Sequence, residues 1–348
     1  MKKIFYSLLA VAAITACAKS GIEYDNDKVA ISFAPVPTNI TKSVAGVDAN
    51  GTYDSTFPTD LNLYITANAQ GEDTNGNLTA EWPDTYFANA KFIYGRLANN
   101  VYEGETAQYW PNVKSLVFAG FSNACNIDDI AENAVVDFDD NTISINGYVQ
   151  DNSLTAAGAN DLMWFPWDTK SYTKQNTAVT ATMKHACSWI TVKVIGDATT
   201  GENYLLNNLT INGLYHKGNV VCDASKATWA LSGAAEAEVL YNNATGEKFP
   251  LPTGTAKVFE NVKNNMVVLP QTPTSINVTY SYYAQEGADL ITETVENLNL
   301  KISDNADANK WESGKHYIYT ITITATEILV APAVDKWVDT TVTPNINA

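Results

Sequence analysis

The sequence predicts an all-β protein of two tandem β-sandwich domains, and three observations support this prediction. Strand-forming residues are abundant in the 348-residue chain, which has 18 Tyr, 11 Phe and 8 Trp. No run of about fifteen residues carries an apolar stripe at helical spacing. Alternating segments recur roughly every ten residues, separated by Gly, Pro, Asn and Asp, which is typical of sandwiches. The length is sufficient for two domains of ordinary size.

The first residues predict an export signal. Lys2 and Lys3 precede an apolar run from Ile4 to Ile14 that is too short to span a membrane. The run ends in the tetrapeptide ITAC, which resembles the bacterial lipobox. We therefore expect residues 1–16 to be a lipoprotein signal peptide. Cys17 would become the mature N-terminus, and its acyl chains, such as palmitate, would hold the protein to a membrane.

The expected first domain covers residues 29–180 and follows a polar tether at residues 17–28. It opens with VAISFAPV, in which Ile31 and Phe33 share one face of a first strand. A long loop rich in Asn, Gly and Thr comes next. Further strands are expected in LNLYITAN and SLVFAGFSN, and a hairpin in DFDDNTISINGY.

The expected second domain covers residues 181–348, with strands in SWITVKVIG, NYLLNNLTINGL, MVVLPQTPTSINVTYSYY and LITETVENLNL. Its clearest strand is YIYTITI at 317–323, which places two Tyr and two Ile on one face. The final extended segment contains Pro332, which cannot donate a ladder hydrogen bond. This segment should therefore lie at a sheet edge or pair on one side only.

Charge and cysteine content narrow the class of protein. The net charge of −17 argues against nucleic-acid binding, which needs a basic patch. Without Cys17, the remaining cysteines are Cys125, Cys187 and Cys222. Their odd number and the absence of C-x-x-C spacing predict buried free thiols rather than a disulfide scaffold. The alternative of one disulfide bond between two of these three cysteines stays open.

Three constellations have both a chemical and a structural interpretation. His185 and Cys187 share a strand face, but the sequence offers no acidic residue close by, so core packing is favoured over a nucleophile with its base. The DFDDN stretch at 137–141 lacks the Gly and the distal Glu of a calcium loop and predicts a solvated hairpin. Trp164 and Trp167 could form a sugar platform, although burial in a sandwich is commoner. We therefore expect no enzyme activity, cofactor or metal.

Several motifs in a fixed order resemble the fimbrillin family, in its minor-fimbrium (Mfa-like) branch. After the lipobox these are ISF, TKS, YWP with LVFAGF, DLMW, KHACSWITVKV, INGLYHKGN, VVLPQ and W-x-x-G-K-x-Y-x-Y-T-I-T-I-T. The resemblance implies two transthyretin-like β-sandwich domains and export as an outer-membrane lipoprotein. It also implies assembly into a type V pilus, or fimbria, that supports cell adhesion.

The resemblance further implies donor-strand exchange. In fimbrillins a protease cuts the loop after the first strand, and the C-terminal segment of the next subunit fills the slot that this strand leaves. Carried over to this chain, the leaving strand contains Ile31 and Phe33, and the cut falls at Lys42–Ser43. The candidate donor residues are Leu329, Val330, Val334 and Trp337.

One departure from the family pattern keeps two functions open. Lys42 stands where many relatives carry Arg, and the single Arg of the chain is Arg96, well inside the first domain. The leading prediction is a polymerising shaft or tip subunit whose partners are other fimbrial subunits. The alternative is an uncut fimbrial anchor, or a non-polymerising surface lipoprotein that binds glycan or host protein.

Overall fold

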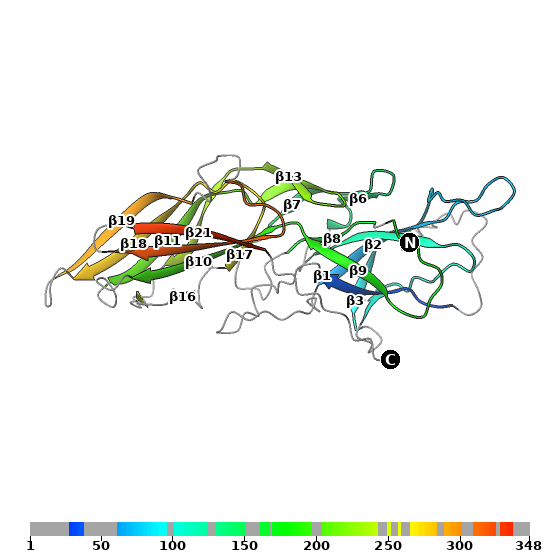
Figure 1. Cartoon of the computed structure of the whole chain (residues 1–348), viewed down its shortest axis with the longest axis horizontal. Coiled ribbons are helices and arrows are strands. Elements are labelled where there is room, and N and C mark those ends of the chain that lie inside the picture. The colour runs from blue at the N-terminus through cyan, green and yellow to red at the C-terminus, as the bar shows by residue number, and fades with distance from the viewer. Residues whose placement is uncertain are drawn as a thin grey trace, which may run out of the picture.

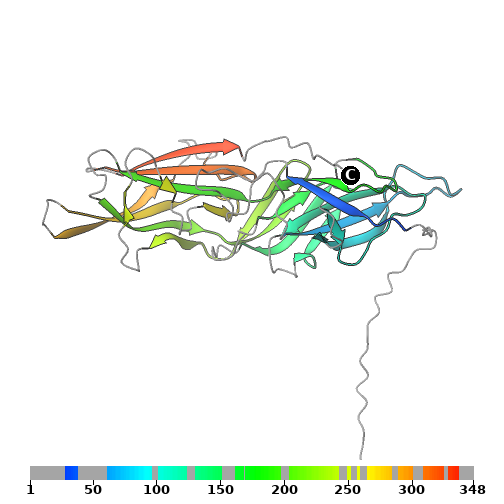
Figure 2. The ribbon, with the colours of Figure 1, turned by 90° about the horizontal axis from the view of Figure 1, so that it is seen from below.

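The computed structural model describes most of the chain in thirteen segments: 28–37, 61–95, 101–123, 130–150, 161–167, 169–196, 204–242, 249–251, 257–258, 265–283, 289–300, 309–324 and 328–336. Every regular element within these segments is a β-strand, which confirms the all-β prediction. The strands build an elongated molecule (Figures 1 and 2).

The first sheet is a closed barrel that begins with β1. In order around the barrel, its strands are β1 (Ser32–Pro37), β4 (Tyr102–Gly104), β3 (Asp84–Tyr94), β2 (Asn62–Ala69), β5 (Leu116–Asn123), β8 (Met163–Phe165) and β9 (Val179–His185). Alternate side chains of the strands point inward. These inward side chains are aromatic and aliphatic. Phe33, Phe92 and Phe118 are among the buried side chains of this core.

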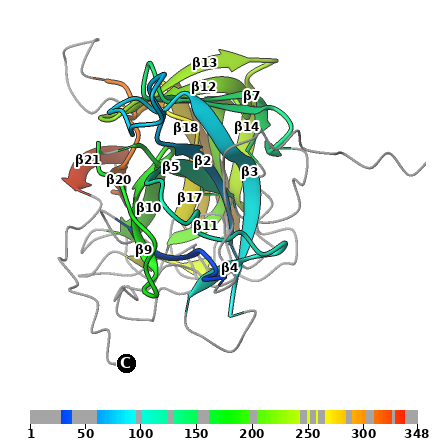
Figure 3. The same cartoon turned by 90° about the vertical axis from the view of Figure 1, so that its right-hand side faces the viewer.

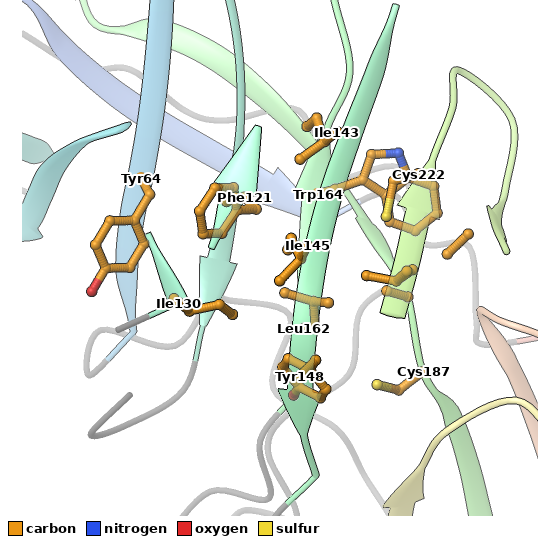
Figure 4. Packing of buried hydrophobic residues seen from close by; sticks show 14 of the residues in the cluster. Tyr64, Phe121, Ile130, Ile143, Ile145, Tyr148, Leu162, Trp164, Cys187 and Cys222 are labelled. Carbon is orange, nitrogen blue, oxygen red and sulfur yellow. The ribbon is translucent and has the colours of Figure 1, made fainter. Parts of the chain in front are cut away.

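A second sheet covers the outside of the barrel. Its order is β13 (Ala227–Ser232), β12 (Lys217–Cys222), β7 (Thr142–Val149) and β6 (Ala134–Asp137). Its inner face packs on the outer face of β2, β5 and β8, with Ile143, Val220 and Cys222 against Phe121 and Trp164 (Figure 4).

The pairing of β7 with β12 joins residues on the two sides of the expected domain boundary. Residue 180 itself lies within β9. The division into 29–180 and 181–348 stays a prediction, as does the transthyretin-like topology.

The remaining strands form two sheets that face each other. One has the order β16 (Lys257–Val258), β10 (Ser188–Gly196), β20 (Lys315–Ile323) and β21 (Ile328–Lys336), with β17 (Asn265–Val268) also paired to β10. The other has the order β14 (Glu236–Asn242), β11 (Tyr204–Leu214), β18 (Ser275–Tyr283) and β19 (Leu290–Asn299), with β15 (Phe249–Pro250) on β11. One apolar core fills the space between them.

The strand β20 has the predicted alternation. Every second side chain from Tyr317 to Ile323 is buried, and those between are only partly covered. The preceding turn is fixed by two buried aromatic side chains. Trp311 Nε1 donates to the Tyr319 hydroxyl at 2.8 Å, and that hydroxyl donates to the Leu300 carbonyl at 3.1 Å. Gly314 has a φ of 68°, which favours glycine over other residues in this turn.

Some strands escaped the sequence analysis. The longest is β3, whose sequence DTYFANAKFIY does not alternate cleanly. Its Asn89 has a φ of 45°, and the ladder between β2 and β3 shifts register near this residue. Such an irregularity breaks the period-two pattern by which a strand is found in a sequence.

The cysteine prediction is confirmed for two of the three residues. Cys187 and Cys222 are free thiols and wholly buried. Cys125 lies outside the described residues.

Candidate functional site

The strand β1, predicted to leave the fold, lies between two neighbours in the barrel. It runs antiparallel to β4, where Phe33 is opposite Tyr102. It runs parallel to β9, where the register extends from Phe33 opposite Val179 to Pro37 opposite Met183. Figure 3 shows β1 beside β9 and β4 at one end of the molecule. Removal of β1 would therefore open the barrel between β4 and β9.

The side chain of Ile31, the residue just before β1, and that of Phe33 in β1 contribute to the core of the barrel. Ile31 and Phe33 have exposed fractions of 1% and 0%. The Phe33 ring lies edge-on to Phe92 and Phe118, with ring centroids 4.9 and 5.2 Å apart. The slot that β1 fills is thus lined by aromatic rings, and an occupant must supply apolar side chains to replace those of β1.

Backbone hydrogen bonds hold the start of β1 on both sides but its end on one side. Ile31 N donates to the Gln108 carbonyl at 2.7 Å, and Trp110 N donates to the Val29 carbonyl at 3.0 Å. After Phe33, the described register continues on β9 alone. Pro35 and Pro37 have no N–H to donate, and parallel pairing is slightly weaker per residue than antiparallel pairing. The end of β1 nearest the expected cleavage loop is therefore the less firmly held end.

The residues predicted for lipidation and cleavage, and one predicted donor residue, fall outside the described segments. These are Cys17, Lys42, Ser43 and Trp337. The structure does not bear on them, and they stay predictions.

The predicted donor segment forms β21, which pairs with β20 along its whole length and is an edge strand. This confirms the position expected from Pro332. Leu329 is 48% exposed. Ile328 and Val330 instead pack partly against the core. Leu329 and Val330 therefore point to opposite faces and cannot both enter one row of pockets.

Ile328 begins the predicted donor segment but is not one of its four candidate anchor residues. It shares the face of Val330, and a count of two along the strand would have found it. Val334 lies on β21 opposite Tyr317.

A buried acidic partner for His185 is a correction to the sequence analysis. His185 Nδ1 lies 2.6 Å from Asp161 Oδ2, and both side chains are almost fully buried. The two residues are 24 positions apart, so proximity in the sequence could not reveal the pair.

Cys187 nevertheless remains a core residue. Burial, reinforced by the negative charge of Asp161, raises the pKa of its thiol well above the usual value. A nucleophilic cysteine needs the opposite shift, so core packing is the correct interpretation.

The structure also supports the structural interpretation of the DFDDN stretch and of the two Trp residues. Asp137 Oδ1 accepts from the backbone N–H of Asp139 at 2.9 Å and of Asp140 at 3.0 Å, so it stabilises the turn between β6 and β7. Trp164 is buried, and its Nε1 donates to the Asp223 carbonyl at 2.9 Å. Trp167 is only partly buried and does not form an exposed platform with Trp164.

Two further statements hold for the described part of the chain. Within it, no group of three or more His, Cys, Asp or Glu side chains is placed to hold a metal ion. None of its residues forms a helix long and apolar enough to cross a membrane.

Comparisons with known proteins place this chain in a family. The model of the fimbrillin-like family matches residues 52–337. A fimbrial protein from Bacteroides vulgatus is 13% identical over 88% of this chain and 99% of its own, with a TM-score of 0.54. The tip fimbrial protein Mfa3 from Porphyromonas gingivalis, with a C-terminal truncation, is 10% identical over 89% and 99%, with a TM-score of 0.36. No curated protein sequence matches the chain.

The likeness to the Bacteroides vulgatus structure is one of fold, because the identity is low. It agrees with the all-β architecture. The family match carries the function, since it covers most of the chain. The family consists of structural fimbrial subunits of the cell surface rather than enzymes, which confirms the prediction of a non-enzymatic role. The chain therefore belongs to the fimbrillin-like family and is a fimbrial subunit.

Proposed function

We propose that this fimbrial subunit polymerises in the shaft or at the tip of a type V fimbria by donor-strand exchange. In this proposal it travels through the periplasm as a lipoprotein, anchored through Cys17 to the outer membrane. Cleavage at Lys42–Ser43 then separates β1 from the rest of the chain. The next subunit supplies its C-terminal strand to the slot that β1 leaves.

The observation that carries the proposal is the position of β1. It is the first described strand, and residues 38–61 separate it from β2. One cut in that connection leaves β1 and the preceding Ile31 held by hydrogen bonds and by two buried side chains, those of Ile31 and Phe33. Burial of each such side chain stabilises by about 1.5–3 kcal/mol, so a donor that brings equivalent side chains can replace the strand.

The properties of β21 support its role as donor. Among the described strands it has one hydrogen-bonded neighbour and lies at the sheet edge, and Leu329 is about half exposed. In Figures 1 and 2, β21 and β1 lie in opposite halves of the molecule. A contact between the slot of one copy and the C-terminal strand of the next is head-to-tail and does not close on itself, so it produces a filament. Leu329, Val330, Val334 and Trp337 remain the candidate anchor residues, and because Leu329 and Val330 point to opposite faces, only one of these two enters the slot.

The second candidate is an uncut fimbrial anchor, and the closed barrel favours it. In the intact chain β1 completes the barrel between β4 and β9, so the subunit has a full core without any donor. Such a subunit would keep its lipid on Cys17. It would hold the fibre at the membrane, or act alone as a surface lipoprotein for host protein or glycan.

The N-terminal residue and intact mass of the protein from native cell surfaces test the proposal. A chain that begins at or near Ser43 and carries no lipid supports strand exchange. A chain that begins at acylated Cys17 overturns it in favour of the anchor. The variant Lys42→Ala should block the cut, whereas Lys28→Ala, which changes a lysine on the other side of β1, should leave it unchanged.

A further inference from the structure

A groove of about 530 Å³ lies where three parts of the chain meet. Glu81, Trp82 and Pro83 line it from the segment before β3, Phe138 and Asp139 from the turn after β6, and Trp167 from the segment after β8. Its volume falls in the range of about 300–1,000 Å³ that is usual for ligand sites. No motif in the sequence joins these three segments.

The aromatic side chains form the floor and the walls of this groove. Phe138 is buried, and Trp82 and Trp167 are partly buried. The Trp167 ring is steeply inclined to both neighbours, at 70° to Trp82 and 66° to Phe138, with centroids 6.4 and 6.0 Å away. Rings inclined in this way present both faces and edges to an occupant, as the walls of an aromatic cage do.

Side-chain amides hold the two walls in place. Asn68 Nδ2 donates to the Trp82 carbonyl at 2.7 Å, and Asn141 Nδ2 donates to the Trp167 carbonyl at 2.8 Å. Asp139 belongs to the turn that Asp137 stabilises. The groove is therefore built before any ligand arrives, which lowers the ordering cost of binding.

Charge indicates the kind of occupant. Glu81 and Asp139 are exposed and line the groove beside the three rings. The chain as a whole carries a net charge of −17. Aromatic faces and carboxylates both attract organic cations, and the negative surface raises their local concentration. A neutral ligand can donate hydrogen bonds to these carboxylates, but only a cation also gains a net Coulomb attraction from their charges.

We propose that this groove binds an arginine side chain presented by a protein partner of the fimbria. A guanidinium group stacks on aromatic rings, pairs with carboxylates and is more weakly hydrated than an ammonium group, so it suits this lining better than lysine. The site is separate from β1 and β21, and it does not depend on strand exchange. It would give the subunit a means of adhesion to basic protein surfaces.

The test uses the folded protein and calorimetric titration with three blocked tripeptides. These are Gly-Arg-Gly, Gly-Lys-Gly and Gly-citrulline-Gly, in which citrulline has the shape of arginine without its charge. We expect the arginine peptide to bind about tenfold more tightly than the citrulline peptide, with lysine between them. Equal binding of the arginine and citrulline peptides would overturn the proposal.

Matched variants assign the binding to the groove. Glu81→Gln with Asp139→Asn removes both carboxylates and changes the net charge by two. Asp140→Asn with Glu296→Gln changes the charge equally at exposed residues outside the lining. The first pair should weaken arginine binding about tenfold, and the second should leave it within about twofold. Equal losses in both pairs would mean that general charge attraction is responsible, and would refute the site.

A third variant, Trp82→Leu, keeps apolar volume but removes an aromatic wall, and it should also weaken binding of the arginine peptide. Unfolding midpoints of all variants show that the fold is retained. A panel of neutral oligosaccharides completes the test. If an oligosaccharide binds in a Trp82-dependent way and the arginine peptide does not, the groove is a carbohydrate site and the proposal is wrong.

Discussion

The substitution Phe33→Ala distinguishes a strand that leaves from one that stays. Phe33 is wholly buried in the intact barrel and lies edge-on to Phe92 and Phe118. If β1 is removed during assembly, the same substitution should have no effect on the assembled fibre. The prediction therefore concerns two states of one protein.

The magnitude follows from the environment of the ring. Truncation of a buried Phe to Ala costs about 3–5 kcal/mol, which includes the lost transfer energy and the cavity that remains. The two edge-on ring contacts place Phe33 toward the upper part of that range. The stability of the uncut precursor should fall by this amount, since no solvent reaches the site to refill it.

Urea unfolding of the precursor and thermal dissociation of fibres on denaturing gels measure the two states. Phe92→Ala is the matched control, because Phe92 is also wholly buried but belongs to β3, which stays in the subunit. This control should weaken both precursor and fibre. Phe33→Ala should weaken the precursor alone and should speed the release of β1 after the cut.

One result would refute this reasoning. If fibres of the Phe33→Ala protein dissociate as readily as those of Phe92→Ala, β1 is still in place in the assembled subunit. Strand exchange at this slot would then be abandoned.

Three further predictions concern other parts of the molecule. Leu329→Asp should stop polymerisation yet change monomer stability by no more than about 1 kcal/mol, because Leu329 is about half exposed on an edge strand; persistent ladders on gels would show that Leu329 is not an anchor. Burial lowers the pKa of His316, which stacks on Trp189, to about 3. Between pH 6.5 and about 3 the unfolded chain therefore binds a proton that the folded chain does not, and stability falls with acidification by up to about 1.4 kcal/mol per pH unit. His316→Phe should flatten this part of the pH profile of unfolding, and an unchanged profile would contradict the assignment. Cys187 and Cys222 should resist thiol reagents at pH 8 until the protein unfolds, measured in a Cys125→Ser background, since burial raises the pKa of both thiols; labelling of the folded protein at the rate of a free thiol would disprove it.

Local patterns were sufficient for a large part of the fold. The alternation from Tyr317 to Ile323 and the single proline of the last segment identified β20 and the edge position of β21. Both features depend only on residues close in the sequence. The pairing of β7 with β12 did not follow, because register between distant strands is set by cores that form only in three dimensions.

The candidate site, like the fold, could be predicted from local sequence only in part. Ile31 and Phe33 could be assigned to one buried face from their spacing alone. The exposure of Leu329 could not, because an edge strand has one covered face and the sequence does not tell which face that is. The partners Asp161 and His185, and the groove between Trp82 and Trp167, join segments far apart in the chain.

The direct continuation of β9 into β10 has a mechanical consequence for a fibre built as proposed. Only Ala186 and Cys187 separate β9, a wall of the slot, from β10, which lies parallel to β20. Tension applied by a neighbouring subunit in the slot would enter β9 and pass along the covalent backbone into β10. From there it would reach β20 and the outgoing C-terminal strand through a ladder that extends from Trp189 opposite His316 to Gly196 opposite Ile323. In that geometry the hydrogen bonds share the force in shear instead of breaking one after another. A pulled fibre of this design should therefore resist the separation of β10 from β20 within each subunit.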